Sequence, residues 1–172
     1  ILANDIYSNI NDPPFDNSSM DGYAVIYSDT IDATETNPIE LKIIETISAG
    51  ETTSKKLTSG FAIKIMTGAP IPNGADSIIM VEKTKKINDN VLLYSPSFPN
   101  YIRIKGENIS KNQLIFEKGT FISPREIGLL ATMGISEISV IKQLKISIIP
   151  TGDELISPGK ELLPGQIYES NS

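Results

Sequence analysis

A polar loop leads into an apolar strand over Pro13-Pro14-Phe15-Asp16-Asn17-Ser18-Ser19-Met20-Asp21-Gly22-Tyr23-Ala24-Val25. Just before Gly22, this run places two carboxylates, an amide and two hydroxyls within six residues. Amide and hydroxyl side chains satisfy local backbone groups, glycine relieves a φ constraint, and carboxylates can bind a divalent cation. By spacing alone, an ordinary polar turn that enters a strand is favoured over a cation site.

Most of the remaining chain also has strand character. Alternating and β-branched runs are separated by Gly, Pro, Asn and Asp, a pattern that predicts many short strands. The strands are expected at residues 23–27, 39–47, 61–66, 77–82, 84–87, 91–94, 137–141 and 144–150. The pair 84–87 and 91–94 is predicted to form a hairpin across residues 88–90.

One helix is predicted over residues 124–133. Ser123 suits the N-cap, Pro124 the first helical position and Glu126 the third, which is the capping-box pattern. Gly134 is placed to end the helix. After it, residues 144–150 are apolar on both faces, as expected of a strand buried in an α/β sheet. We therefore predict an α+β, mostly β fold, with a boundary near Gln143 where an α/β domain begins.

The composition excludes several classes of chemistry. The 172 residues contain no cysteine and no histidine, so disulfides, thiolate sites and imidazole catalysis are absent. A net charge of −6 argues against binding to nucleic acid or to an anionic membrane. The apolar runs are too short to span a bilayer and the start lacks the order of a secretory signal, so a cytoplasmic location is expected.

Two further segments carry candidate anion-binding groups. Thr67 and Gly68 follow a predicted strand, where backbone N–H groups and a hydroxyl can form a small anion-binding concavity. Arg103 and Lys105 alternate with isoleucines, so in a strand both cations would share one face and suit an oxyanion such as phosphate. A loop that only turns the chain, and solvated surface charge, are the alternatives for the two segments.

An acidic pair, Asp153 and Glu154, follows the predicted strand 144–150. Ligands bind at the carboxyl ends of strands in α/β sheets, so this loop is a candidate site. The two acids can equally belong to the first turn of a short helix, where they would only interact with its dipole.

Four blocks of this sequence resemble the molybdopterin molybdenumtransferase family, which includes MoeA and the gephyrin E-domain. The first block is residues 13–25. The others are Gly60-Phe61-Ala62-Ile63-Lys64-Ile65-Met66-Thr67-Gly68-Ala69-Pro70-Ile71-Pro72 with Gly74-Ala75-Asp76, then Ile102-Arg103-Ile104-Lys105-Gly106-Glu107-Asn108-Ile109, and Thr151-Gly152-Asp153-Glu154-Leu155 with Gly165-Gln166-Ile167-Tyr168. Their order and spacing are similar to those of the family along the whole chain.

The resemblance implies a domain organisation. Residues 1–27 and 110–143 would form an elongated α+β domain, residues 28–109 an inserted β-rich, barrel-like domain, and residues 144–172 the start of a truncated α/β molybdopterin-binding domain. The chain would then be an N-terminal fragment of a cytoplasmic homodimer whose cleft lies between subunits. By itself the fragment is expected to be inactive.

The resemblance also implies an activity. The parent enzyme would hydrolyse adenylated molybdopterin in the presence of molybdate, insert molybdenum and use Mg²⁺. The residues that match are Asp21 and Glu154 as the catalytic acids, Asp21 and Glu107 as metal ligands, and Thr67, Gly68, Arg103, Lys105, Asn108 and Ser18 as substrate or anion contacts.

One position departs from the family pattern. Asn108 stands where the family usually carries an aspartate, and an amide supplies no negative charge to a cation site. Either Glu107 substitutes, or position 108 only forms hydrogen bonds, or catalysis is weakened.

Two other functions remain open from the sequence. One is a noncatalytic β-rich dimerisation or scaffold module whose polar loops are structural. The other is a carboxylate-based hydrolase complete within this chain, which would need two acids to converge in a pocket.

Overall fold

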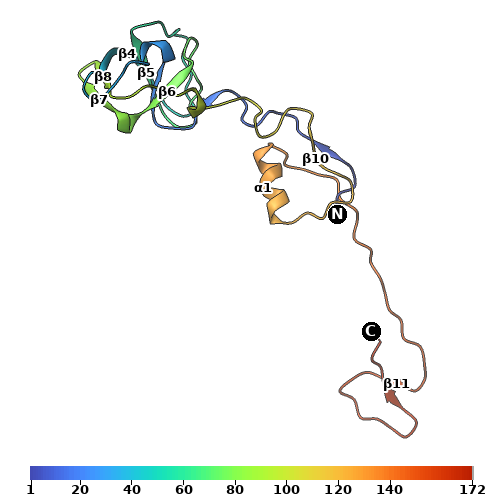
Figure 1. Ribbon diagram of the computed structural model, residues 1–172. Coiled ribbons are helices and arrows are strands. Elements are labelled where there is room, and N and C mark those ends of the chain that lie inside the picture. Colours follow the sequence, from blue (N-terminus) through green and yellow to red (C-terminus); the bar gives the residue numbers. More distant parts are fainter. Residues whose placement is uncertain (172) are drawn as a thin grey trace. The chain divides into compact units, whose positions relative to one another are not determined.

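The computed structural model describes residues 1–171, which form two compact units (Figure 1). The first unit comprises residues 1–139 and the second begins at residue 140. The structure is mostly β, with one α-helix in the described part of the chain.

A curled six-stranded sheet forms the larger part of the first unit (Figure 1). Its strands, in spatial order, are β6 (Ser77–Met80), β3 (Gly22–Val25), β5 (Phe61–Ile65), β4 (Ile39–Ile47), β8 (Asn90–Leu93) and β7 (Thr84–Ile87). Only β4 and β5 are parallel; the other neighbours are antiparallel. The strand β3, which follows the polar loop, therefore lies between β5 and β6.

Both faces of β3 are buried, which explains why its sequence is continuously apolar. Tyr23 and Val25 pack in one hydrophobic cluster with side chains of β4, β5, β6 and β8. Ala24 points to the other face and packs with Ile47, Ile63 and others in a second cluster. Successive side chains of a strand alternate between faces, so three consecutive residues contribute to two cores.

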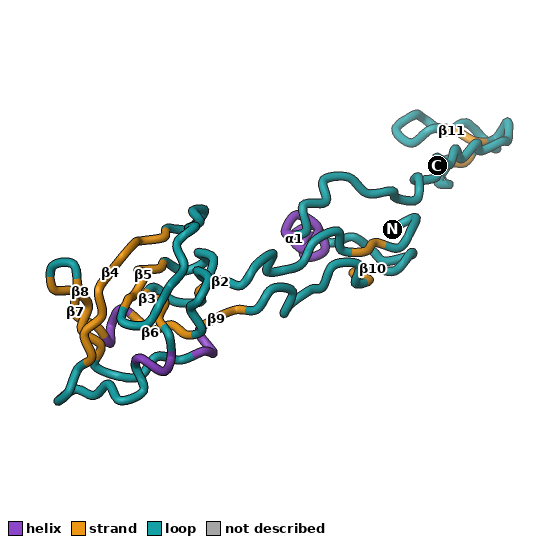
Figure 2. The backbone as a smooth tube through the Cα atoms, turned by 90° about the horizontal axis from the view of Figure 1, so that it is seen from above, coloured by secondary structure: helices purple, strands orange, loops and turns teal. Residues whose placement is uncertain are grey.

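Two short ladders lie outside the six-stranded sheet within this unit. Figure 2 shows β2 (Asn17–Ser18) beside β9 (Ile102–Arg103), and β1 (Ile6–Tyr7) pairs with β10 (Leu114–Phe116). Three 3₁₀ turns connect the strands: η1 (Tyr27–Asp29), η2 (Val81–Lys83) and η3 (Pro99–Tyr101). Because β2 pairs with β9, the first and third sequence blocks are in direct contact.

The helix α1 (Pro124–Thr132) confirms the predicted capping box. The Ser123 hydroxyl accepts a hydrogen bond from the Arg125 N–H, and Glu126 accepts one from the Ser123 N–H. Gly134 follows with a φ of +69°, a conformation that glycine adopts without strain.

Most predicted strands of the sheet are confirmed, with small differences at their ends. The strands at 39–47 and 84–87 have the predicted bounds. The strand predicted at 23–27 ends at Val25 because the chain turns into η1, and the strand at 77–82 ends at Met80 because η2 begins. The hairpin loop is shorter than predicted, because Asn90 is already in β8.

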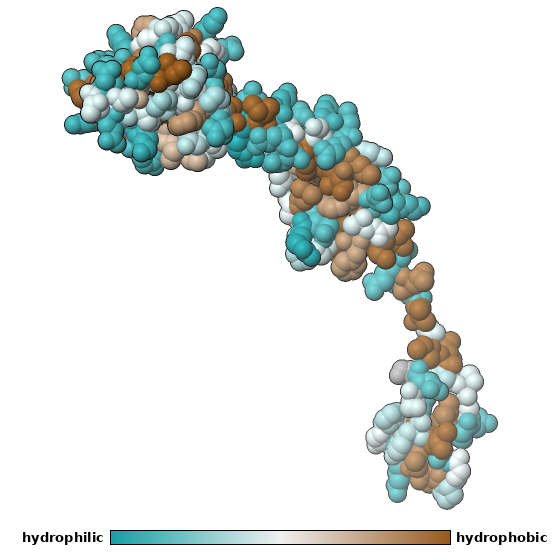
Figure 3. All heavy atoms as spheres, in the orientation of Figure 1, coloured by the Kyte–Doolittle hydropathy of each residue, from teal (hydrophilic) through white to brown (hydrophobic). Residues whose placement is uncertain are grey.

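The strands predicted at 137–141 and 144–150 are wrong for this structure. Neither range contains a strand, and Leu144, Ile146 and Ile149 are 84%, 81% and 79% exposed. Figure 3 shows hydrophobic side chains at the surface here. A strand needs a neighbour that takes its backbone hydrogen bonds, and the described residues provide none beside 144–150.

The second unit contains a small two-stranded parallel ladder of β11 (Leu155–Ile156) and β12 (Ile167–Tyr168). Among residues 1–171, no helix has the length and apolar composition needed to cross a membrane. The finer domain boundaries expected at residues 27, 109 and 143 stay predictions.

Candidate functional site

The candidate site is centred on a contact between Asp21 and Thr67. Asp21 immediately precedes β3, and Thr67 is the second residue after the end of β5. Gly22 is opposite Ile65 in the antiparallel register, so the start of β3 meets the end of β5. The Thr67 N–H and the Thr67 hydroxyl both donate to Oδ1 of Asp21, each at 2.7 Å. The first and second sequence blocks therefore meet at this carboxylate.

The two hydrogen bonds hold Asp21 in its ionised form. The backbone N–H of Thr67 contributes most to lowering the pKa of Asp21, followed by the Thr67 hydroxyl and the charge of Lys64. Asp21 is exposed, so the carboxylate is negative at neutral pH and open to solvent. Such a group can accept hydrogen bonds or contribute one oxygen to a cation.

The N–H groups of the Thr67 loop have protein acceptors in this structure. Gly68 donates to the Ser18 carbonyl at 2.8 Å, and Ala69 donates to the Met66 carbonyl at 3.0 Å. Gly68 has a φ of +81°, as the third residue of such a turn requires. The expected concavity of free N–H donors is therefore absent from residues 67–69, and both donors of Thr67 bond to Asp21.

Ser18 is buried behind this loop. Its side chain donates to the Met20 carbonyl at 2.5 Å, and its backbone N–H donates to the Ala69 carbonyl at 3.0 Å. Only 1% of the residue is exposed. These contacts fix the polar turn to the Thr67 loop, so Ser18 supports the site from behind.

Gly22 is required because a side chain would not fit at this position, and not because of its φ angle. A Cβ atom at this position would lie 2.0 Å from the Ile79 carbonyl oxygen of β6. Gly22 is not among the residues with a positive φ, so the sequence-based reason for this glycine was wrong. Its missing side chain lets β6 approach the residue that follows Asp21.

Arg103 and Lys105 do not share a strand face. The strand β9 ends at Arg103, and Lys105 lies in a turn whose Gly106 has a φ of +75°. Arg103 donates through Nε to Oε1 of Glu107 at 2.8 Å, whereas Lys105 has no described side-chain partner. The prediction of a shared face was wrong because the extended run is only two residues long.

Glu107 closes the same turn. Its Oε2 accepts a hydrogen bond from the Ile104 N–H at 2.9 Å. The Arg103 side chain and this N–H lower the pKa of Glu107, in that order. Both carboxylate oxygens therefore have protein donors. Among residues 1–171, no group of three or more acidic side chains could hold a metal ion, and the metal pair Asp21 and Glu107 stays a prediction.

Asn108 uses its amide as a hydrogen-bond donor. Its Nδ2 donates to Oδ2 of Asp12 at 2.8 Å, and its backbone N–H donates to the Asp12 carbonyl at 3.0 Å. An aspartate at position 108 would place two carboxylates next to each other. Of the three explanations for this departure from the family, the structure favours hydrogen bonding.

Glu154 belongs to the second unit. Its carbonyl accepts a hydrogen bond from the Ile167 N–H at 2.8 Å, and its side chain is exposed. It precedes β11 directly, in a turn closed by a bond from the Leu155 N–H to the Gly152 carbonyl. Glu154 thus follows an exposed, non-strand segment rather than the predicted buried strand.

Lys64 is a residue of the site that the sequence did not single out. It lies on β5 opposite Tyr23 and is half-buried, and its charge lowers the pKa of Asp21. The sequence feature that could have indicated Lys64 is a cation in an otherwise apolar strand, three residues before Thr67. The sequence alone could not assign it to Asp21, because their electrostatic interaction depends on the pairing of β3 with β5.

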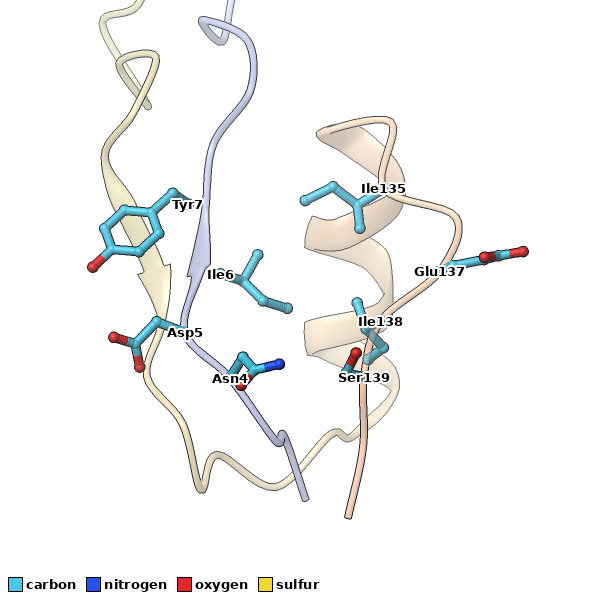
Figure 4. A pocket seen from close by; sticks show the side chains of 8 residues that line it. All are labelled: Asn4, Asp5, Ile6, Tyr7, Ile135, Glu137, Ile138 and Ser139. Carbon is cyan, nitrogen blue, oxygen red and sulfur yellow. The ribbon is translucent and has the colours of Figure 1, made fainter. Parts of the chain in front are cut away.

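A separate pocket of about 300 Å³ lies between β1 and the segment after α1 (Figure 4). Its wall combines Ile6, Ile135 and Ile138 with polar residues such as Asn4 and Glu137. None of the predicted site residues lines this pocket, so the candidate site is the exposed surface around Asp21.

Comparisons with known proteins give the family. Residues 1–134 match the family described as the MoeA N-terminal region, domains I and II. The chain is 42% identical over 173 residues to molybdopterin molybdenumtransferase 2 of Mycobacterium tuberculosis, covering 100% of this chain and 43% of that protein. It is 40% identical to the molybdopterin molybdenumtransferase of Staphylococcus aureus, covering 99% of this chain and 41% of that protein.

Solved structures agree. The molybdopterin biosynthesis MoeA protein from Pyrococcus horikoshii OT3 superposes with a TM-score of 0.88 at 39% identity, covering 100% of this chain and 46% of that chain. Another solved structure, described as a molybdopterin biosynthesis MoeA protein from Pyrococcus horikoshii, gives a TM-score of 0.85 at 42% identity, covering 99% of this chain and 44% of that chain. The chain thus spans less than half the length of these relatives. It belongs to the MoeA N-terminal region family and is homologous to the molybdopterin molybdenumtransferases.

Proposed function

We propose that this chain is part of an enzyme that inserts molybdenum from molybdate into adenylated molybdopterin and releases AMP. The observation that carries the proposal is the double hydrogen bond from Thr67 to Asp21. It joins two sequence blocks that lie 46 residues apart and orients an exposed, ionised carboxylate. Relatives about 40% identical are named molybdopterin molybdenumtransferases, which supports the transfer of molybdenum to molybdopterin. The adenylated substrate and the release of AMP are what the family resemblance implies.

In this proposal, each side chain binds the substrate through atoms that form no hydrogen bond within the protein. The hydrogen bonds from Thr67 occupy Oδ1 of Asp21, so Oδ2 receives the attacking water or a substrate donor. Lys105 has an unpaired ammonium group, which suits molybdate or a phosphate as a point charge. Nε of Arg103 donates to Glu107, so Arg103 would bind an anion through its other two guanidinium nitrogens.

The described residues do not fit a complete Mg²⁺ site. Asp21 offers one free oxygen, both oxygens of Glu107 accept hydrogen bonds from protein donors, and no cluster of three acids exists among residues 1–171. Mg²⁺ usually takes one or two carboxylates together with water and substrate phosphates. We therefore assign Asp21 as at most one ligand and derive no step through the metal.

The whole enzyme in this proposal is a cytoplasmic homodimer. An α/β molybdopterin-binding domain would begin near residue 144, and it would cover the exposed apolar segment 144–150. This is consistent with the apolar side chains of that segment, which lack cover in the described residues. Glu154 would then face the pterin substrate, and the elongated and inserted domains would carry Asp21 and Thr67.

Asp21→Asn in the full-length parent protein tests the proposal. The substitution keeps the size of the side chain but removes its charge. We expect AMP release and molybdenum insertion to fall by roughly a hundredfold or more, as when a positioned acid–base group is lost. The matched control is Asp32→Asn, at an exposed aspartate outside the four blocks, which should retain activity. Purified adenylated molybdopterin and molybdate are the substrates.

The same experiment separates the enzyme from the scaffold module. If the parent protein carries Asp21→Asn with undiminished turnover, while its dimerisation is intact, the polar turn is structural and the module is favoured. If both Asp21→Asn and Asp32→Asn reduce turnover equally, the effect is not specific to the site and the proposed role of Asp21 is wrong.

A further inference from the structure

A small apolar pocket of about 220 Å³ lies beside β6, outside the Asp21 site. Its apolar wall comes from Ile79 and Met80 of β6, from Pro96, and from an aromatic pair formed by Phe98 and Tyr101. The two rings are 5.8 Å apart between centroids, with an angle of 73° between their planes. This edge-to-face geometry is favourable and leaves ring surface for a further apolar group.

Hydrogen bonds hold the segment that carries Phe98 in place. Ile78 and Phe98 exchange two backbone hydrogen bonds, at 3.2 and 2.9 Å. The buried Ser97 hydroxyl lies 2.7 Å from the Thr30 hydroxyl and 2.6 Å from the Ser77 hydroxyl. A fully hydrogen-bonded polar network in a core holds one geometry. The pocket is therefore preformed, which lowers the entropic cost of binding.

A polar hollow adjoins this pocket. Lys83 and Ser95 line both spaces, and the hollow is completed by Glu35, Glu82 and Tyr94. The structure pairs neither Glu35 nor Glu82 with a cation among residues 1–171. The lining thus contains two carboxylates without an ion-pair partner and one lysine, so the hollow favours a positively charged group.

From these two adjoining spaces we infer that the β6 edge binds an extended segment of a partner protein that carries a bulky apolar side chain next to a basic one. The apolar side chain occupies the pocket at Phe98 and Tyr101, and the basic side chain lies beside Glu35 and Glu82. Lys83 binds a backbone carbonyl of the segment. An aromatic anchor in a preformed pocket with charges at its rim is the usual anatomy of such contacts. This inference does not depend on the proposed enzyme activity.

The test is an NMR titration of the ¹⁵N-labelled chain with N-acetyl-Phe-Arg-amide. Saturable shifts are expected at residues 95–101 and at Glu82, at peptide concentrations up to about 10 mM. N-acetyl-Phe-Glu-amide should bind roughly three- to tenfold more weakly, because exposed ion pairs contribute modestly. N-acetyl-Ala-Arg-amide should give no saturable shift, since it lacks the anchor. Equal binding of the Arg and Glu peptides, or no saturation, would overturn the inference.

Matched variants locate the two contacts. Phe98→Ala should abolish binding, whereas Phe121→Ala, which truncates a more exposed aromatic residue elsewhere, should not. Glu35→Gln with Glu82→Gln should remove the preference for the Arg peptide, whereas Glu117→Gln should preserve it. Shifts of residues 95–101 that depend on protein concentration without peptide would identify a second copy of this chain as the occupant and overturn the inference.

Discussion

Asp21 accepts two hydrogen bonds from Thr67 through a single oxygen, Oδ1, with both donor–acceptor distances at 2.7 Å. The residues come from the start of β3 and the end of β5, so the antiparallel register of these strands builds the contact. The donors of Thr67 are therefore used by Asp21, so Thr67 would influence a ligand through this carboxylate. Its substitution should be visible in the titration of Asp21.

Thr67→Val should raise the pKa of Asp21 toward its ordinary value of 3.8 without fully restoring it. Valine removes the hydroxyl donor, whereas the backbone N–H of residue 67 still donates. A ¹³C-detected pH titration of the Asp21 carboxyl group measures the change. Thr67→Ser retains both donors and should leave the pKa of Asp21 lowered. An unchanged pKa in Thr67→Val would show that the hydroxyl bond contributes nothing.

The sign of the effect on stability follows from the lowered pKa. A carboxylate whose pKa is lowered by folding stabilises the native state above the unfolded-state value of 3.8. This contribution is lost as the pH falls through the lowered value in the folded state. The difference in stability between the natural chain and Thr67→Val should therefore be constant near pH 7 and shrink in acid, as urea denaturation at several pH values can show.

Gly22→Ala should destabilise the protein by about 2 kcal/mol or more. Its Cβ would meet the Ile79 carbonyl oxygen at 2.0 Å, and that backbone atom belongs to a paired strand. Gly128→Ala in α1 is the control, since its Cβ meets nothing within 4 Å. It should stabilise the helix by roughly 0.5–1 kcal/mol. Urea denaturation followed by circular dichroism measures both, and equal effects would contradict the steric explanation.

Local signals predicted the elements whose ends are set by nearby residues. Ser123 and Glu126 mark the start of α1, and turn residues mark both ends of β4 and the C-terminal end of β7. Asn88 in the hairpin loop has a φ of 52°, which asparagine tolerates better than most residues. These features depend on a few neighbouring residues, so the sequence contains their cause.

Features that depend on a distant partner could not be predicted in the same way. The apolar composition of residues 144–150 predicts a buried strand. No residue in this run specifies which strand would lie beside it, and the segment is exposed in the structure. The resemblance identified Asp21 and Thr67, whereas their contact follows from the pairing of β3 with β5. The sequence predicts that the N–H and hydroxyl donors of Thr67 and Gly68 bind a ligand. Their acceptors in the structure are Asp21 and Ser18, which lie far away in the sequence and could not be recognised from it.

Ser123→Ala should destabilise α1 by about 1 kcal/mol, because the N-cap hydroxyl that accepts from the Arg125 N–H is lost. The Ser123 side chain contributes most to lowering the pKa of Glu126, so this pKa should rise in the variant. Thermal unfolding and an NMR titration of Glu126 measure the two effects. The double variant with Glu126→Ala should be less destabilised than the sum of the single variants. Simple additivity would argue against a reciprocal capping box.

Asn108→Asp should destabilise the protein by about 1 kcal/mol at pH 7, since an amide that donates to Asp12 becomes a second carboxylate. The repulsion requires both groups to be ionised, so the loss should diminish as the pH falls and one of them takes up a proton. Asp12→Asn combined with Asn108→Asp reverses donor and acceptor and should recover most of the stability. Urea denaturation at pH 7 and pH 4 compares the three variants. If Asn108→Asp is neutral at pH 7 and turnover of the parent enzyme increases, position 108 contributes to a cation site rather than to a structural hydrogen bond.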